Sequence, residues 1–188
     1  MKPIQIRLDA RGRLWMIGST VYPQIEPGQI PNDKVLVLED TDGDGRCDKT
    51  TVFADGLMIP TGLELGDGGA YVGHGPELLF LKDTDGDGKA DERRVVLRGF
   101  GTGDNHQNIN SFRWGPGGEL WFSQGLHTRS HVETPWGLAH LEQAGLWRLR
   151  PRRLKLEGFY GSEHEPQNPW GYVFTHWGAP IVLAGNNS

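Results

Sequence analysis

The sequence predicts an all-β protein of the β-propeller type, and three observations lead to this prediction. A pattern of two short apolar strands around a glycine turn occurs four times, an acidic turn occurs twice, and no segment has the periodicity of an amphipathic helix. The composition agrees, because 28 glycines and 12 prolines among 188 residues favour short strands joined by tight turns.

The four copies of the hairpin pattern are spaced like the repeats of a propeller. They read IRLDARGRLWMIG, LELGDGGAYVGHG, FRWGPGGELWFSQG and YVFTHWGAPIVLAG, with turn glycines at Gly12, Gly69, Gly118 and Gly178. These glycines are 49 to 60 residues apart, and a propeller blade typically has about 40–50 residues. Further strand candidates between the hairpins are DKVLVLED, KTTVFADG, ELLFLKD, RRVVLRGF and the longer AGLWRLRPRRLKLEGF.

We therefore expect a single domain over residues 1–188, with about three blades and the start of a fourth. Both ends of the chain fall within strand patterns. Because closed propellers usually need at least four blades, we expect a fragment truncated at both ends, or a chain that closes by association. We also expect the isolated chain to be inactive.

Charge and cysteine content exclude several classes. The formal net charge of −5 indicates neither nucleic acid nor an anionic membrane as partner. The single cysteine, Cys47, excludes an internal disulfide framework and a cysteine-based zinc cluster. No apolar run is long enough to span a bilayer, and the first residues lack the apolar stretch of a secretory signal.

The acidic turn reads DTDGDGRCD at residues 40–48 and DTDGDGKAD at residues 83–91. It matches part of an EF-hand loop, whose carboxylates at positions 1, 3 and 5 precede a glycine at position 6. The glutamate of position 12 is replaced by Thr51 and Arg94, and no helix flanks either turn. The predicted ligands are Asp40, Asp42, Asp44 and Asp48 in the first turn and Asp83, Asp85, Asp87 and Asp91 in the second.

We interpret these turns as structural Ca²⁺ sites of modest affinity that link two strands, one in each blade. Three carboxylates within six residues repel one another unless a cation is present. Mg²⁺ fits less well because it requires stricter geometry. The alternative is a turn without metal, in which the aspartates accept hydrogen bonds from their own backbone.

Polar residues concentrate in two segments. The first contains Asp104, His106, Asn108, Asn110, His127, Arg129, His131 and Glu133, and the second contains Glu163, His164, Glu165, Asn168 and His176. In a propeller, the loops that enter the innermost strands gather around the central channel. His106 precedes the strand SFRWG and Asn168 precedes YVFTHWG, so we expect both near that channel. His106 is either a proton acceptor or a channel residue that only hydrogen-bonds neighbouring turns.

A second candidate metal site is weaker. His127, His131 and Glu133 form an H-x-x-x-H-x-E pattern with two imidazoles and a carboxylate. We expect this segment to be a loop, which does not align the three groups, and the alternative is a polar channel loop. We interpret the tryptophans, including Trp177, as mostly packing residues.

Several motifs resemble known dehydrogenases. HQNINSFRWGPGGELWF resembles the histidine-containing segment of soluble quinoprotein glucose dehydrogenases, and PQNPWGYVF is similar to their Arg-Asn-Pro-x-Gly segment. Together, NSFRWGP, HVETPWG, NPWGYVF and the DTDGDG turns resemble more closely the propellers of PVC-type membrane-bound dehydrogenases. In that family of heme-binding proteins, a c-type heme domain follows the propeller. The resemblance covers essentially the whole chain.

The resemblance implies a six-bladed propeller related to PQQ-dependent glucose and sorbosone dehydrogenases, located in the periplasm or cell envelope. His106 would take a proton from the hydroxyl of a sugar or alcohol while a hydride passes to the quinone. Asn110, Asn168 and His127 would contact the cofactor, and electrons would pass to the heme c domain. No membrane contact is expected from this segment.

The sequence departs from the sugar-dehydrogenase pattern at three points. Gly117 replaces the aspartate of Gly-Pro-Asp-Gly, Gln167 replaces the arginine before Asn-Pro, and the spacing from His106 to Gly115 differs by one residue. These departures weaken the prediction of PQQ more than that of the fold. One alternative is a non-catalytic, calcium-stabilised propeller that binds glycans or proteins at the cell envelope, and another is a lactonase-type metal hydrolase.

Overall fold

The protein is all-β, and its computed structural model describes residues 1–160 and 168–185. The strands are β1 (Lys2–Leu8), β2 (Leu14–Ser19), β3 (Asp33–Glu39), β4 (Lys49–Leu57), β5 (Pro60–Gly66), β6 (Gly69–His74), β7 (Glu77–Lys82), β8 (Glu92–Arg98), β9 (Asn110–Trp114), β10 (Leu120–Gln124), β11 (Ser130–Thr134), β12 (Gly137–Leu141), β13 (Gly145–Arg150), β14 (Lys155–Tyr160), β15 (Asn168–Phe174) and β16 (Pro180–Gly185). The only helical segment in this part is a 3₁₀ turn, η1 (Pro151–Arg153). No helix in the described residues is long and apolar enough to cross a membrane.

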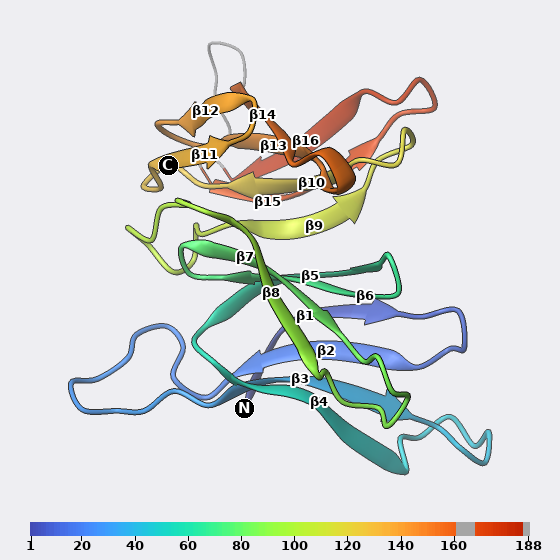
Figure 1. The fold of residues 1–188 in the computed structure, drawn as a ribbon. Coiled ribbons are helices and arrows are strands. Elements are labelled where there is room, and N and C mark those ends of the chain that lie inside the picture. Colours follow the sequence, from blue (N-terminus) through green and yellow to red (C-terminus); the bar gives the residue numbers. More distant parts are fainter. Residues whose placement is uncertain (161–167, 186–188) are drawn as a thin grey trace. The chain divides into compact units, whose positions relative to one another are not determined.

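The strands form three four-stranded antiparallel sheets and two hairpins (Figure 1). The first two sheets have the orders β1-β2-β3-β4 and β5-β6-β7-β8, so each follows the order of the chain. The third has the order β9-β10-β13-β14, with the hairpin β11-β12 inserted between its second and third strands. The hairpin β15-β16 follows the third sheet in the sequence.

The chain divides into two compact units. One contains Met1–His74 and Leu79–Val95, and the other contains Gly75–Leu78 and Val96–Ser188.

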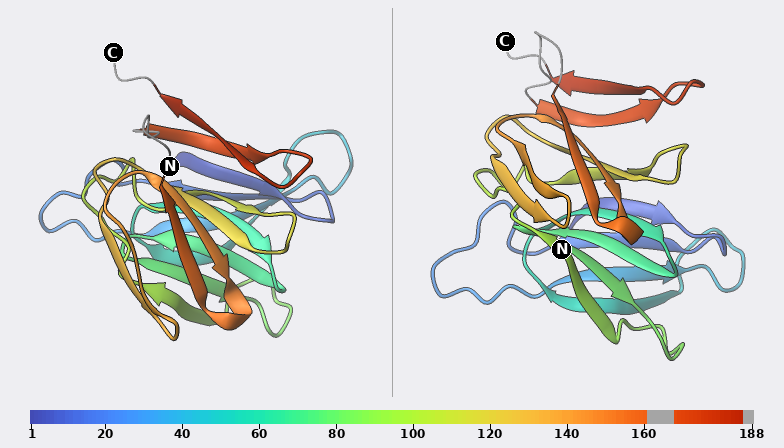
Figure 2. Two further views of the ribbon diagram at one scale, coloured as in Figure 1. Left: turned by 90° about the horizontal axis from the view of Figure 1, so that it is seen from above. Right: turned by 45° about the horizontal axis from the view of Figure 1, so that its top comes forward.

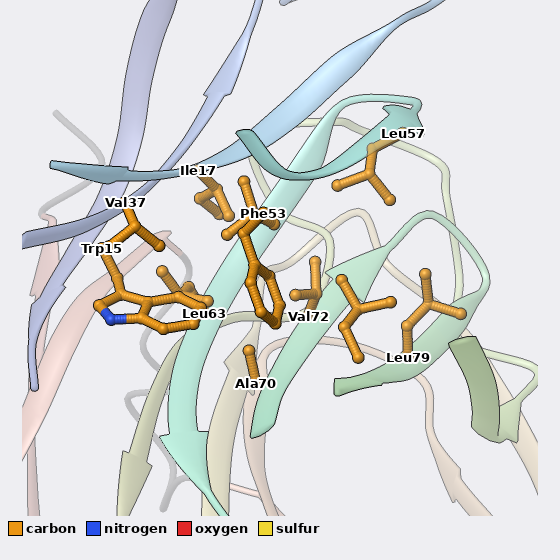
Figure 3. Packing of buried hydrophobic residues seen from close by; sticks show 11 residues of the cluster. Trp15, Ile17, Val37, Phe53, Leu57, Leu63, Ala70, Val72 and Leu79 are labelled. Carbon is orange, nitrogen blue, oxygen red and sulfur yellow. The ribbon is translucent and has the colours of Figure 1, made fainter. Parts of the chain in front are cut away.

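The core of the first unit lies where β5 packs against β1 and β2. In β3, Val35 and Val37 are buried while their neighbours are half-exposed, which is the alternation of a strand with one face toward a core. Trp15, Phe53 and Leu63 come from three different strands and meet in this cluster (Figure 3). Burial of these apolar side chains is the main force that holds the unit together.

Aromatic side chains dominate the core of the second unit. Phe112 and Phe122 stack with ring centroids 4.8 Å apart, and Trp147 is fully buried beside Phe122. A smaller cluster around Trp121 and Tyr172 packs β15 against the third sheet.

Gln124 is the last residue of β10, and its side chain hydrogen-bonds the segments at both ends of the inserted hairpin. Its buried Nε2 donates to the carbonyls of Thr128, Leu141 and Gln143 at 2.9, 3.2 and 2.7 Å. Its Oε1 accepts from Trp147 Nε1 at 2.9 Å. The hairpin stands beside the sheet, with β12 next to β14 (Figure 2).

Three of the four predicted glycine turns share one geometry. In residues 9–13, 115–119 and 175–179, the first N–H donates to the fifth carbonyl at 3.1, 2.8 and 2.8 Å. The fourth residue is Gly12, Gly118 or Gly178, with φ of 79°, 79° and 80°. This left-handed conformation favours glycine, so the turn residues in the sequence correctly predicted the hairpins.

The prediction of Gly69 as the second turn glycine is wrong. The turn between β5 and β6 has two residues, Asp67 and Gly68, with φ of 50° and 79°. Gly69 already belongs to β6, opposite Gly66. A Cβ atom at Gly69 would collide with the carbonyl of Leu81, so this glycine is required by close packing.

Three other expectations also differ from the structure. The run WRLRPRRLKLE is not one strand, because η1 separates β13 from β14 and Leu154 adopts φ of 50°. The third sheet has this turn where the first two have the acidic turn, so the acidic turn does not recur in every sheet. Trp177 is 88% exposed and therefore does not pack in a core.

Candidate functional site

His106 lies on the connection between β8 and β9. Its backbone N–H donates to Asp104 Oδ1 at 2.8 Å, and its ring Nδ1 lies 2.9 Å from the same oxygen. The His106 side chain is 58% exposed. The carboxylate of Asp104 therefore holds the imidazole in one orientation at a surface that solutes can reach.

Asp104 carries negative charge at neutral pH. Partial burial alone would raise the pKa of its carboxyl group, but hydrogen bonds from the backbone and ring of His106 and the charges of His106 and His127 lower it. An ionised carboxylate at Nδ1 stabilises the protonated form of an imidazole, which is useful where histidine accepts a proton.

Gln107 joins the loop of His106 to the loop after β10. Its carbonyl accepts hydrogen bonds from the Gly125 backbone at 2.9 Å and from Thr128 Oγ1 at 2.7 Å. Its side-chain Oε1 accepts from the His127 backbone at 2.7 Å. Three hydrogen bonds to one residue fix the two loops side by side.

Glycines allow the two loop backbones to touch. A Cβ atom at Gly101 or Gly103 would collide with the backbone of Arg129 or His127, respectively. His127 and Arg129 are both exposed, and Arg129 has no ion-pair partner among the described residues. The paired loops thus present an imidazole and a guanidinium next to the segment that carries Asp104 and His106.

Asn110, a predicted cofactor contact, is engaged in internal hydrogen bonds. Its Nδ2 donates to the Asn108 carbonyl at 2.7 Å, and its Oδ1 accepts from Ser111 Oγ and Ser123 Oγ, each at 2.8 Å. These bonds hold the start of β9, where Ser111 has φ of 56°. These bonds use both lone pairs of Oδ1 and one of the two Nδ2 hydrogens, so Asn110 could offer a cofactor only the other Nδ2 hydrogen.

The other predicted residues near this site are placed only in part. Asn168 begins β15 opposite Gly185, and its side chain lies outside the described residues. Glu163, His164, Glu165 and Gln167 also lie outside the described residues. His176 is exposed in the turn between β15 and β16.

The residues of the H-x-x-x-H-x-E pattern do not come together as a metal site. His131 and Glu133 lie on the strand β11, so the expectation of a loop is wrong for them. His131 pairs across the hairpin with His140, and its Nε2 lies 2.9 Å from Glu142 Oε1. Among the described residues, only two groups of aspartates place three ligand atoms within metal-binding distance of one another.

These two groups belong to the acidic turns, which connect the third and fourth strands of their sheets. Carboxylate oxygens of Asp40, Asp42 and Asp48 lie within 4.8 Å of one another, as do those of Asp83, Asp85 and Asp91. Asp44 and Asp87 lie outside these trios, and each accepts a hydrogen bond from the backbone two residues further on. The structure thus brings together six of the eight predicted ligands.

Backbone hydrogen bonds preform both turns. Asp40 accepts from Gly45 at 2.8 Å and from Gly43 at 2.7 Å, and these bonds lower the pKa of its carboxyl group. Asp83 accepts from Gly86 and Gly88 in the same way, with the same effect on its pKa. Carboxylates at this spacing fit the oxygen-ligand chemistry of Ca²⁺. The same hydrogen bonds also fit the alternative of a turn without metal.

In the sequence, Asp104 is only one polar residue among several, and nothing marks Gln107 as a link between loops. The spacing Asp-x-His contains a signal, because an aspartate often accepts a hydrogen bond from the backbone two residues on. The role of Gln107 had no local signal, because its partners are about 20 residues away in the sequence.

The fold and these sites define an all-β domain of antiparallel sheets with a solvent-facing Asp–His pair and two acidic turns. The chain belongs to the DUF7133 family, a domain of unknown function, whose profile matches residues 1–188. A comparison with curated proteins found no match.

Proposed function

We propose that this domain is part of a β-propeller dehydrogenase that oxidises a hydroxyl group of a sugar or alcohol, with His106 as the proton acceptor. The observation that carries the proposal is the contact of 2.9 Å between Asp104 Oδ1 and His106 Nδ1 at an exposed position. An imidazole oriented by a carboxylate is a recurrent arrangement for general-base catalysis.

The order of the strands supports the propeller part of the proposal. Each four-stranded sheet follows the chain, apart from one inserted hairpin, and a further hairpin follows the third sheet. Consecutive four-stranded antiparallel sheets are the units from which propellers are built. In such a fold, His106 would lie on a loop that enters the first strand of a blade.

Oxidation of an alcohol removes a proton and a hydride; His106 would take the proton, and a quinone outside the described residues would take the hydride. A substrate hydroxyl that hydrogen-bonds to the His106 ring would transfer its proton there, and the Asp104 carboxylate would stabilise the resulting imidazolium. Such general-base assistance typically contributes about 10²–10⁴-fold to the rate. His127 and Arg129 would help to bind and orient the substrate from the adjoining loop.

Two features of the chain fit PQQ poorly. Asn110 is held by three internal hydrogen bonds, and Gln167 replaces an arginine that would contact an anionic cofactor. The quinone, the heme c partner and the periplasmic location therefore rest on the family resemblance.

The test compares His106→Gln and Asp104→Asn with the control His140→Gln in the longer dehydrogenase of which this domain is proposed to be part, by dye-linked oxidation of sugars and alcohols. We expect kcat/KM to fall by about 10²–10⁴ for His106→Gln, less for Asp104→Asn, and to be unchanged in the control. Wild-type turnover that survives His106→Gln would rule out the proposed base. Glycan binding at the His106 loop without turnover by the wild type would favour the non-catalytic propeller instead.

For the acidic turns we propose structural Ca²⁺ ions, each bound by one aspartate trio. The donor set supports this proposal, since three hard oxygen ligands within 4.8 Å of one another suit Ca²⁺. A bound ion would relieve the repulsion between the carboxylates and tie together the two strands that each turn connects.

A further inference from the structure

The first unit contains an open groove that has no part in the proposed dehydrogenase site. Its volume is about 670 Å³, which lies within the usual range for small-molecule sites, about 300–1,000 Å³. The groove is lined by the turns at residues 9–13 and 66–69, by β4, and by the second acidic turn. The His106 loop belongs to the other unit.

The apolar part of the groove lining is largely aromatic. Trp15 and Phe53 pack edge to face with ring centroids 4.6 Å apart, and both line the groove. Val37 and Leu65 extend this apolar surface. Most of Trp15 and Phe53 is buried in the core, so a ligand would meet the edges of rigidly held rings.

Four charged groups of the lining are paired with one another, and Arg11, Asp83 and Asp87 also line the groove. Arg13 Nε lies 2.7 Å from Asp9 Oδ2 and its Nη1 lies 3.8 Å from Glu39, while Lys49 Nζ lies 2.7 Å from the other oxygen of Glu39. Asp9, Arg13, Glu39 and Lys49 therefore form one ion-pair network of alternating sign. This network presents donors and acceptors at fixed positions, and its four charges sum to zero.

Glycines provide another part of the lining. Gly66, Gly68 and Gly69 border the groove on one turn, and Gly86 and Gly88 border it on another. A Cβ atom would meet only Lys82 at 3.8 Å beside Gly68 and nothing within 4 Å beside Gly86, so a ligand can approach these two peptide groups directly.

We propose that this groove binds a neutral polyhydroxylated ligand, which is the chemical class of a saccharide. Its C–H faces would cover the edges of Trp15 and Phe53, and its hydroxyls would donate to the carboxylates and accept from Arg13 and Lys49. Because groups of both signs line the groove, a ligand with a net charge would meet lining groups of its own sign. A purely apolar ligand would remove water from the ion-pair network without replacing the hydrogen bonds that the water makes.

The first arm of the test measures binding of maltotriose, cellotriose, xylotriose and N-acetylchitotriose to the full chain by NMR. At least one should shift the backbone amides of Gly66, Gly68 and Gly69, with a Kd of about 1 mM or tighter. Glucose 1-phosphate and glucuronate should bind more weakly than the best neutral probe. The proposal is wrong if none of the four neutral sugars shifts these amides, or if a charged probe binds tighter.

The second arm uses neighbouring residues on one strand. Thr51→Tyr places a large side chain in the groove that Thr51 lines, and should weaken binding at least tenfold. Thr50→Tyr changes the next residue, which points to the other face of the strand, and should leave binding unchanged. Equal affinities of the two folded variants would exclude this groove. If Thr51→Tyr lowers the thermal midpoint, Arg11→Ala replaces it, with a loss of at least threefold expected.

Discussion

Asp9 shows how one turn residue organises several neighbours. Its carboxylate accepts hydrogen bonds from the backbones of Arg11 and Arg13, from Arg13 Nε and from Trp15 Nε1, at 2.7 to 3.0 Å. Burial alone would raise the pKa of Asp9, but these hydrogen bonds lower it from 3.8 to about 2. The folded state therefore binds a proton at this site less readily than the unfolded state does.

We predict that Asp9→Asn lowers the free energy of unfolding by about 2 kcal/mol at pH 7. The wild type should lose this contribution as the pH falls from about 4 to about 2, because the unfolded carboxyl group becomes protonated before the folded one. Urea unfolding of both proteins at pH 7 and pH 2 measures the effect. A difference between them that persists unchanged at pH 2 would contradict the predicted pKa dependence.

Asp33 is a fully buried acid that stabilises two chain reversals. Its Oδ1 accepts from the Thr20 backbone at 2.7 Å and from Thr20 Oγ1 at 3.1 Å, and its Oδ2 accepts from the Ile59 backbone at 2.9 Å. In the sequence, Asp33 is simply the first residue of a strand. Its stabilising contact is with the backbone of Ile59, which is 26 residues away, so the neighbouring residues in the sequence could not reveal it.

We predict that Asp33→Ala lowers the free energy of unfolding by about 2–4 kcal/mol, because buried backbone donors lose their acceptor. The matched control is Asp55→Ala, at an exposed position of β4, which should change stability by less than about 0.5 kcal/mol. Denaturant unfolding monitored by tryptophan fluorescence gives both values. Similar losses in the two variants would show that the hydrogen bonds of Asp33 do not stabilise the fold.

At the scale of elements, the two acidic turns are near copies of each other. Thr41 Oγ1 donates to Asp48 at 2.8 Å, and Thr84 Oγ1 donates to Asp91 at 2.7 Å. The glycines at equivalent positions have φ between 82° and 87°. Because both turns repeat the same internal bonds, any ligand of one turn should also bind the other.

We predict that Ca²⁺ raises the thermal midpoint of the wild type, and that excess EDTA reverses the rise, since a ligand that binds only the folded state stabilises it. The double variant Asp42→Asn, Asp85→Asn removes one trio member from each turn and should lose most of the shift. The control Asp44→Asn, Asp87→Asn lies outside the trios and should retain it. A wild type that is indifferent to Ca²⁺ would favour the turn without metal.

The hairpins were the most predictable elements of the fold. A glycine at the fourth position of a five-residue turn, between two apolar strands, correctly predicted three hairpins, because few other residues adopt its conformation. The prediction failed at Gly69 because two adjacent glycines have different roles: Gly68 forms the turn and Gly69 allows close packing. The strands β11 and β12 were not predicted, because neither SHVET nor GLAHL shows the regular apolar–polar alternation of a half-buried strand.

At the scale of the molecule, one face of the first sheet stands out as apolar. Ile6 and Val52 are 51% and 37% exposed, and Met16 and Leu36 lie between them in one row across the four strands. In the next row, Leu8 is 70% exposed and pairs with Leu14. Contiguous apolar surface of this kind favours association.

We predict that the chain self-associates as its concentration rises, and that Leu8→Lys with Val52→Lys reduces this association by disrupting both apolar rows. The control is Val95→Lys, which changes an exposed valine of similar exposure on β8. Sedimentation velocity at several concentrations measures the effect. A wild type that stays monomeric over the whole range would contradict the prediction.

The third sheet differs from the other two because its inserted hairpin can change in length while the pairing of the sheet's own strands stays the same. β10 and β13 pair directly although 20 residues separate them, and Gln124 closes the sheet beneath the insertion. The tip at residues 134–137 can therefore vary in length with a small loss of chain entropy, about 0.6 kcal/mol for each doubling of a flexible loop. Related chains could acquire new specificities by rebuilding this hairpin while the sheet beneath it stays the same. Engineers could graft recognition loops at the same place.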